Sequence, residues 1–290
     1  MAELVQLLFA GLTTGAVYAL VALGFTLIFQ ASEVVNFAQG EFVMLGGMVT
    51  VFAFKAGLPL PLAAALAIAV AVTTGLLLHR LAIEPAKGAT VVTLIIVTIG
   101  ASILIRGIAQ IVFDKQFHAL PAFTGDEPLR LLGAAILPQS LWVLGGAAAI
   151  VFGLWLFMER TLLGKAVRAT AANRLAAELV GIDTRIVLAL AFAVSAAIGA
   201  VGGILVTPIT LTSYAVGTIL ALKGFAAAML GGIGNPVGAV LGGLVLGLLE
   251  AFAAGRISST YKDGVAFLVI LLVLLVMPQG LLGRRAVERV

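Results

Sequence analysis

The sequence contains no cysteine and only two histidines, His79 and His118, among its 290 residues. Without cysteine, the chain can form no disulfide, thiolate nucleophile or iron–sulfur ligand. The two histidines lie far apart in the sequence, and no carboxylate motif surrounds either of them. We therefore expect no catalytic residue and no metal site in this chain.

Charge is also scarce. Charged residues make up 10% of the sequence and hydrophobic residues 62%, and the mean hydropathy is +1.22. Soluble domains carry about 25% charged residues. Several apolar stretches reach the ~20 residues that a helix needs to cross a bilayer, and none shows the alternation of a membrane β-barrel. The sequence predicts an all-α, polytopic integral membrane protein.

The N-terminal apolar run carries no positive charge, because the first basic residue is Lys55. A cleavable signal peptide begins with a positive region, so we expect this run to remain as the first membrane helix. The net charge of +4 does not indicate nucleic-acid binding, since basic residues of membrane proteins collect in cytoplasmic loops.

Polar, proline and glycine residues divide the apolar runs into about eight to nine membrane segments. The second and seventh are short or interrupted by glycine and polar residues, which is typical of a broken or re-entrant helix. The segments lie near Leu4–Phe29, Val34–Phe54, Leu60–His79, Val91–Phe113, Leu141–Met158, Ile186–Thr207, Val216–Leu230, Val237–Ala254 and Gly264–Leu282.

Lysine and arginine in the short loops predict how the segments are oriented. The basic residues of the loop 159–185 and of the C-terminal tail place both in the cytoplasm, so the loop 114–139 and the N-terminus are expected outside. These basic residues are Arg160, Lys165, Arg168, Arg174 and Arg185 in the loop and Arg284, Arg285 and Arg289 in the tail.

The stretch "TLLGKAVRATAANRLAAELVGIDTR", Thr161 to Arg185, is too polar to cross a membrane. Its alanines and leucines predict a helix of about four turns. Gly164 opens this helix, and Gly181 suits the left-handed position just past its end. A stripe of small residues along it would allow another protein to approach closely. The alternative is a solvated connector that only orients the membrane segments.

Several motifs then carry a family resemblance. "GKAVRATAANRLAAELVGI" resembles the cytoplasmic coupling motif of bacterial ABC-importer permeases, in the version of the branched-chain amino acid permease family, LivH type. "VVNFAQGEFVMLGG" is similar to the "NFA-(H/Q)-G-(E/D)" signature of that family. "ALKGFAAAMLGGIGNPVGAVLGGLVLGLLE" and "VMPQGLLGR" resemble its C-terminal glycine-rich block and its closing motif. In matching order, these motifs cover Gly11 to Arg284.

The resemblance implies that residues 1–290 form a single transmembrane (permease) domain with a cytoplasmic coupling loop at 159–185. Such a subunit lies in the bacterial inner membrane and alternates between outward and inward access. The loop helix would insert into a groove of a cytoplasmic ATPase and pass its movement to the membrane helices. By similarity, the coupling residues are Gly164, Arg168, Ala169, Asn173, Ala177 and Gly181.

The resemblance also implies partners. They are two cytoplasmic ATPase subunits, an extracytoplasmic solute-binding protein, membrane lipid and a second homologous permease, which favours a heterodimer and leaves a homodimer open. The sequence has no G-x-x-x-x-G-K-(S/T) phosphate loop, so ATP is used by the partners, and this chain is a transport subunit without a cofactor of its own. The family carries branched-chain amino acids or related small polar solutes, and no residue selects among them.

Four ionisable residues fall within the predicted segments: Glu41, Arg106, Lys223 and Glu250. A charge at membrane depth costs at least about 2.5 kcal/mol, so such groups face a partner, a cavity or the interface. Arg106 and Glu250 are close enough to segment ends to have a structural role. Lys223 would neutralise Glu41 if the two interrupted segments meet at the centre.

The polar groups of the second segment, Asn36, Gln39 and Glu41, have two interpretations. They satisfy backbone groups where glycines loosen the helix, or they line and gate the translocation path. With Lys223, they are the candidate path residues.

The main alternative to an ABC importer is an ion-coupled secondary transporter of amino or organic acids. Such a transporter needs a coupling-ion site, for which Glu41 and Glu250 are the only carboxylates within the predicted segments. An aquaporin-like channel is a weaker alternative, because the "NFA" copy lacks the proline of a paired Asn-Pro-Ala loop.

Overall fold

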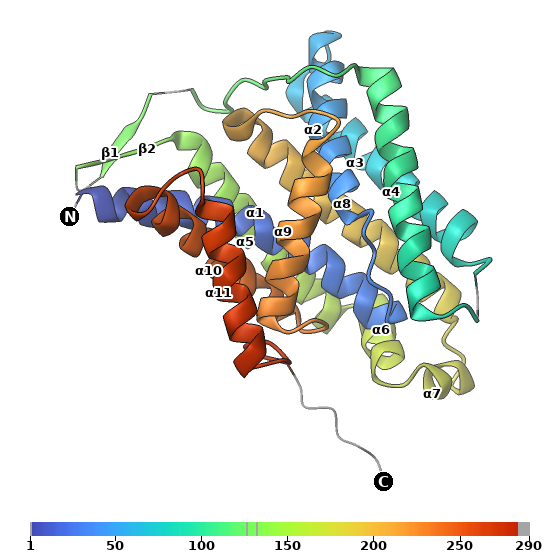
Figure 1. The fold of residues 1–290 in the computed structure, drawn as a ribbon. Coiled ribbons are helices and arrows are strands. Elements are labelled where there is room, and N and C mark those ends of the chain that lie inside the picture. The colour runs from blue at the N-terminus through green and yellow to red at the C-terminus, as the bar shows by residue number, and fades with distance from the viewer. Residues whose placement is uncertain (1, 87, 126, 132, 284–290) are drawn as a thin grey trace.

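The computed structural model of the chain (Figure 1) describes residues 2–86, 88–125, 127–131 and 133–283. Arg284, Arg285 and Arg289, on which part of the predicted orientation depends, lie outside the described residues. The elements are α1 (Ala2–Ser32), α2 (Gln39–Lys55), α3 (Leu60–Leu78), the π-helix η1 (His79–Ile83), α4 (Val91–Phe113), β1 (Leu129–Leu131), β2 (Ala134–Ile136), α5 (Pro138–Arg160), α6 (Leu162–Ala172), α7 (Arg174–Leu179), α8 (Thr184–Thr210), α9 (Val216–Gly231), α10 (Pro236–Arg256) and α11 (Lys262–Val276).

Six helices of the described chain are long and apolar enough to cross a membrane: α1, α3 with η1, α4, α5, α8 and α10. This agrees with a polytopic membrane protein. The prediction of an all-α chain needs one correction, because β1 and β2 form a short antiparallel hairpin in which Arg130 pairs with Ala135. The hairpin and the loops near it lie on one face of the molecule, and α6 and α7 lie on the opposite face (Figure 1).

Helix α1 is the centre of the bundle and α4 lies at its edge. In the apolar window of α1, 83% of the residues are buried, against 6% in α4. The close packing of α1 against α10 depends on glycine, since a Cβ on Gly247 would lie 2.3 Å from the Cα of Gly15. In membranes, small residues let helix backbones approach in this way.

The second predicted segment is shorter than expected and is not broken, because α2 runs from Gln39 to Lys55 without interruption through Gly40, Gly46 and Gly47. After α1 the chain turns at Glu33, whose φ is 57°, and residues 33–38 are not helical before α2 begins at Gln39. The start of α2 then meets the start of α9, because a Cβ on Gly40 would lie 1.9 Å from the carbonyl oxygen of Gly217. The second and seventh predicted segments therefore pack against each other in the interior, and α9, like α2, is an unbroken helix.

Candidate functional site

Gln39 joins three helices in the interior. Its side chain is fully buried, its Nε2 donates to the Ser195 carbonyl oxygen over 3.2 Å, and the Ser195 hydroxyl donates to its Oε1 over 2.6 Å. A Cβ on Gly24 of α1 would lie 1.9 Å from Nε2 of Gln39. Both the oxygen and the nitrogen of the Gln39 amide therefore have hydrogen-bond partners within the bundle.

Asn36 lies in the connector before α2. Its Oδ1 accepts from the Ala38 backbone N–H over 3.1 Å, which turns the chain into the helix. Its Nδ2 is buried and has no hydrogen-bond partner among the described residues. Thr98 of α4 holds the same connector, since its hydroxyl accepts from the backbone N–H of Phe37 over 3.2 Å.

Glu41, in the first turn of α2, is 1% exposed. Its Oε1 accepts from the Ser102 hydroxyl of α4 over 2.8 Å. Its Oε2 has no hydrogen-bond partner in the part of the chain that the structure describes. A buried carboxylate oxygen without a partner is costly, so it requires a functional or structural reason.

Arg106 completes a polar group around Glu41. It lies one turn beyond Ser102 on the same face of α4, and its guanidinium donates to the Thr218 hydroxyl of α9 over 2.6 Å. The neighbouring Gly217 is next to Oε2 of Glu41, which a Cβ there would approach to 2.7 Å. Glu41, Ser102, Arg106, Gly217 and Thr218 are called the Glu41 cluster below.

Lys223 does not pair with Glu41, and this prediction was wrong. Its Nζ lies 2.9 Å from Oε1 of Glu250 and 2.8 Å from Oδ1 of Asp263, and it donates to the Tyr18 hydroxyl over 3.0 Å. That hydroxyl in turn donates to Glu250 over 2.7 Å. The lysine and both carboxylates therefore form a paired cluster between α1, α9, α10 and α11, called the Lys223 cluster.

The loop helix predicted as one piece is two. Asn173 ends α6 and begins α7, and its Oδ1 accepts from the Ala176 backbone N–H over 3.0 Å. An asparagine cap competes with helix continuation, which is the physical reason for the break. Gly181 follows α7 with φ of 90°, as predicted.

Some of the predicted coupling residues are buried against the rest of the chain, and others are exposed on the surface of α6 and α7. Gly164 packs against α5, because a Cβ there would lie 2.2 Å from the Phe157 carbonyl oxygen. Ala177 is buried, Ala169 is half-buried, and Asn173 and Gly181 are exposed. Arg168 is exposed and donates to the Glu159 carboxylate.

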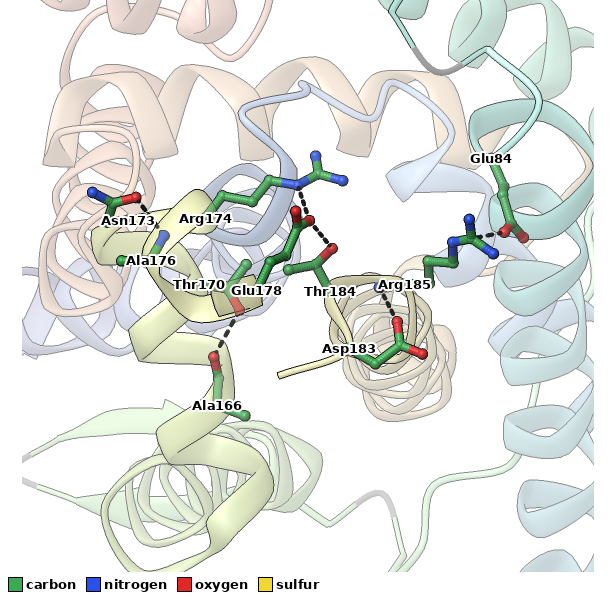
Figure 2. Close-up of polar contacts among 10 residues, drawn as sticks. All are labelled: Glu84, Ala166, Thr170, Asn173, Arg174, Ala176, Glu178, Asp183, Thr184 and Arg185. Atoms are coloured by element: carbon green, nitrogen blue, oxygen red, sulfur yellow. Dashed lines mark hydrogen bonds and ion pairs between the residues drawn. The ribbon is translucent and has the colours of Figure 1, made fainter. Parts of the chain in front are cut away.

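A polar network fixes α7 to the start of α8 (Figure 2). Glu178 accepts from the Thr184 hydroxyl over 2.6 Å and lies 3.4 Å from Nε of Arg174. The Thr184 hydrogen bond, followed by Arg174, lowers the pKa of Glu178. Asp183 caps α8 by accepting from the backbone N–H of Arg185 over 2.9 Å.

Large apolar side chains are exposed on this otherwise polar pair of helices. They are Leu162, Leu163, Leu175, Leu179 and Val180. Leu175 and Leu179 lie one turn apart on α7, and apolar side chains exposed together are typical of an interaction surface. No three His, Cys, Asp or Glu residues of the described chain are grouped to hold a metal ion.

A known family matches most of the chain. The profile described as "Branched-chain amino acid transport system / permease component" matches residues 7–274. The chain is 35% identical over 301 residues to the "High-affinity branched-chain amino acid transport system permease protein BraD" of Pseudomonas aeruginosa, covering 98% of this chain and 97% of that protein. It is 34% identical over 302 residues to the corresponding protein LivH of Escherichia coli (strain K12), with the same coverage.

More distant relatives transport another solute. The "Ribose import permease protein RbsC" of Haemophilus influenzae is 28% identical over 276 residues, covering 90% of this chain and 81% of that protein. Among solved structures, "PsaBC from Streptococcus pneumoniae in complex with Fab" is similar with a TM-score of 0.50 and 15% identity, covering 94% of this chain and 91% of that one. At this identity, the likeness supports the fold alone.

Proposed function

The chain belongs to the family of permease components of branched-chain amino acid transport systems, and from this premise we propose that it imports leucine, isoleucine or valine. It is a transport subunit of an ABC importer in the bacterial inner membrane, and partner ATPases hydrolyse ATP. The names of BraD and LivH support the substrate class. An ion-coupled secondary transporter is not favoured by these relatives.

The proposal includes the topology. The six long helices cross the membrane, and α2, α9 and α11 complete a nine-segment bundle as shorter segments. The face with α6 and α7 is cytoplasmic, because its basic residues follow the positive-inside rule. The face with the β1–β2 hairpin meets the extracytoplasmic binding protein, and the edge that includes α4 meets a second permease subunit.

The α6–α7 pair is the coupling element for the ATPases. The observation that carries this assignment is the exposure of large apolar side chains, Leu175 and Leu179 among them, on a segment too polar to enter the membrane. The network of Glu178 with Thr184 ties α7 to α8. A displacement of α7 would therefore move a membrane helix rather than only a loop.

The Glu41 cluster lines the translocation path. A branched-chain amino acid is a zwitterion, and this cluster offers a carboxylate on α2 and a guanidinium on α4. The bare Oε2 of Glu41 suits a passing ammonium group. The contacts of Gln39 and Lys223 favour structural roles for these two path candidates, and Asn36 remains a candidate through its buried amide nitrogen.

Coupling is tested with Ala169→Glu, which places a bulky acid on the half-buried face of α6. We expect the variant to insert at the wild-type level, to lose co-purifying ATPase subunits and to lose uptake. Ala119→Glu, an exposed alanine of the loop on the opposite face, is the matched control and should retain the ATPases. Wild-type retention of ATPases by Ala169→Glu would remove the coupling assignment.

A further inference from the structure

A pocket of about 330 Å³ lies next to α7, on the face assigned to the cytoplasm. Its walls come from the turn after α1, from η1, from the start of α4 and from α7 and the first turns of α8. No member of the Glu41 cluster lines it. Binding pockets for small molecules begin at about 300 Å³, so this one suits a single small solute.

Charges of both signs meet in this pocket: the carboxylates of Glu33 and Glu84 and the guanidiniums of Arg174 and Arg185. Figure 2 shows Arg185 extending toward Glu84, with its Nε 4.0 Å from Oε1. Arg174 extends toward Glu178, again with Nε nearest. These contacts are long, and a guanidinium has several further N–H donors. A bound carboxylate would give both arginines shorter, charge-assisted hydrogen bonds.

The rest of the lining is largely apolar. Ile83, Leu94 and Leu188 contribute hydrocarbon surface beside the charges. Among the described residues of the lining, two carboxylates face two guanidiniums, and the buried His79 adds an imidazole that packs against the Phe192 ring. This mixed lining does not favour a polyanion such as a nucleotide or a simple cation. The combination instead matches a zwitterion with a short apolar side chain.

Glu33 adds an observation from the backbone. Its φ of 57° lies in the left-handed region, which is sterically unfavourable for residues other than glycine. Glycine or asparagine would make the same turn with less strain. Strained residues cluster at functional sites, and a carboxylate required in the pocket would account for a glutamate at this turn.

We propose that this pocket binds a free branched-chain amino acid from the cytoplasm and that binding slows import. Arg174 and Arg185 hold the ligand carboxylate, and Glu33 and Glu84 hold its ammonium group. Because one wall is α7, the bound ligand ties the coupling element to α1, η1 and α4 and favours the conformation in which the pocket is closed around it. This inference rests on the proposed function, from which it takes the orientation and the substrate class.

The test measures uptake of labelled leucine by the complete transporter in proteoliposomes, with ATP in the lumen and binding protein outside. The lumen, which corresponds to the cytoplasm, contains either no leucine or millimolar unlabelled leucine. We expect lumenal leucine to reduce the initial rate about fivefold or more, as typical coupling between two sites would. The ratio of the two rates is taken within each variant, so a changed basal rate does not matter.

Arg185→Gln and Glu33→Gln should each bring this ratio close to one. Arg80→Gln, an exposed arginine of η1 that is not part of the pocket lining, is the matched control and should keep the inhibition. No inhibition in the wild type, or equal inhibition in all variants, would overturn the inference while ATP-driven uptake remains. Absence of ATP-driven uptake would instead refute the proposed function.

The liposomes contain phosphatidylcholine and phosphatidylglycerol, because an ethanolamine headgroup is also a zwitterion. Inhibition that appears on adding phosphatidylethanolamine without leucine, and that Arg185→Gln removes, would assign the pocket to lipid and overturn the amino-acid assignment. Lumenal 4-methylpentanoate, which lacks the ammonium group, should not inhibit.

Discussion

Glu41 and Glu250 are both buried carboxylates of apolar helices, and their surroundings differ. Oε2 of Glu250 accepts from the Tyr18 hydroxyl over 2.7 Å, and its Oε1, which has no hydrogen bond within the described chain, lies 2.9 Å from the ammonium group of Lys223. Glu41 receives one hydroxyl, from Ser102, and its second oxygen lacks a hydrogen-bond partner within the described chain. The first carboxylate belongs to a cluster that joins four helices, and the second lies beside the sparsely buried α4.

This difference indicates that Glu250 mainly stabilises the fold and that Glu41 is available for transport. Removing one partner of a buried ion pair leaves an uncompensated charge, whereas a carboxylate with an unused oxygen loses little structure when it is neutralised. Substitutions at three carboxylates, or at their partners, can therefore be ranked by the size of the effect expected on stability or uptake. The order is Glu250 within the Lys223 cluster, then Glu41, then the exposed Glu178.

The largest effect on stability is expected for Lys223→Met. It removes the cation from Glu250, whose side chain is 5% exposed, and a broken buried pair costs about 3–5 kcal/mol. The amount of folded protein in the membrane and its thermal midpoint in detergent should fall strongly. Adding Glu250→Gln should recover much of the loss, and a double variant as unstable as Lys223→Met would show that the ion pair is not the cause.

Glu41→Gln should leave stability nearly unchanged and reduce uptake. Glutamine keeps the size of the side chain and an oxygen that accepts from Ser102, so the thermal midpoint should change little. Uptake of leucine should fall about tenfold or more, which corresponds to about 1.4 kcal/mol of lost interaction. Both are measured at matched membrane levels, with the exposed Glu127→Gln as the control. Wild-type uptake would exclude Glu41 from the path.

Glu178 should give the smallest effect, and one that depends on pH. Its pKa is lowered in the folded protein, chiefly by the Thr184 hydrogen bond. The contact therefore stabilises the fold above the pKa of an unfolded glutamate, and this stability is lost as the pH falls through the lower folded pKa. Thermal midpoints of wild type and Glu178→Gln should differ slightly at neutral pH and converge in acid. A difference that grows in acid would contradict this sign.

The apolar runs, and the polar, proline and glycine residues that divide them, predicted much of the fold. The boundaries of α4 agree with the predicted Val91–Phe113, because apolar residues end abruptly at both sides. The second segment was predicted to be short or broken, and α2 is short but continuous, because its glycines allow close packing and do not interrupt the helix. The close approach of α1 and α10 at Gly15 and Gly247 is the packing that small residues allow in membranes.

Pairing across the bundle was not predictable. Helices α2 and α9 meet through Gly40 and Gly217, so their backbones touch, while the side chain of Lys223 contacts Glu250 instead of Glu41. Arg106 was assigned a structural role near a segment end, and its place in the Glu41 cluster depends on how α4 packs. The i, i+4 spacing of Ser102 and Arg106 was the signal available in the sequence.

ATP-driven uptake by the purified complex in proteoliposomes tests most directly whether this chain is the permease of an ABC importer for branched-chain amino acids. The account predicts that leucine accumulates only when the ATPase subunits, the binding protein and hydrolysable ATP are all present. Accumulation driven by an ion gradient, with this chain alone in the membrane, would contradict it.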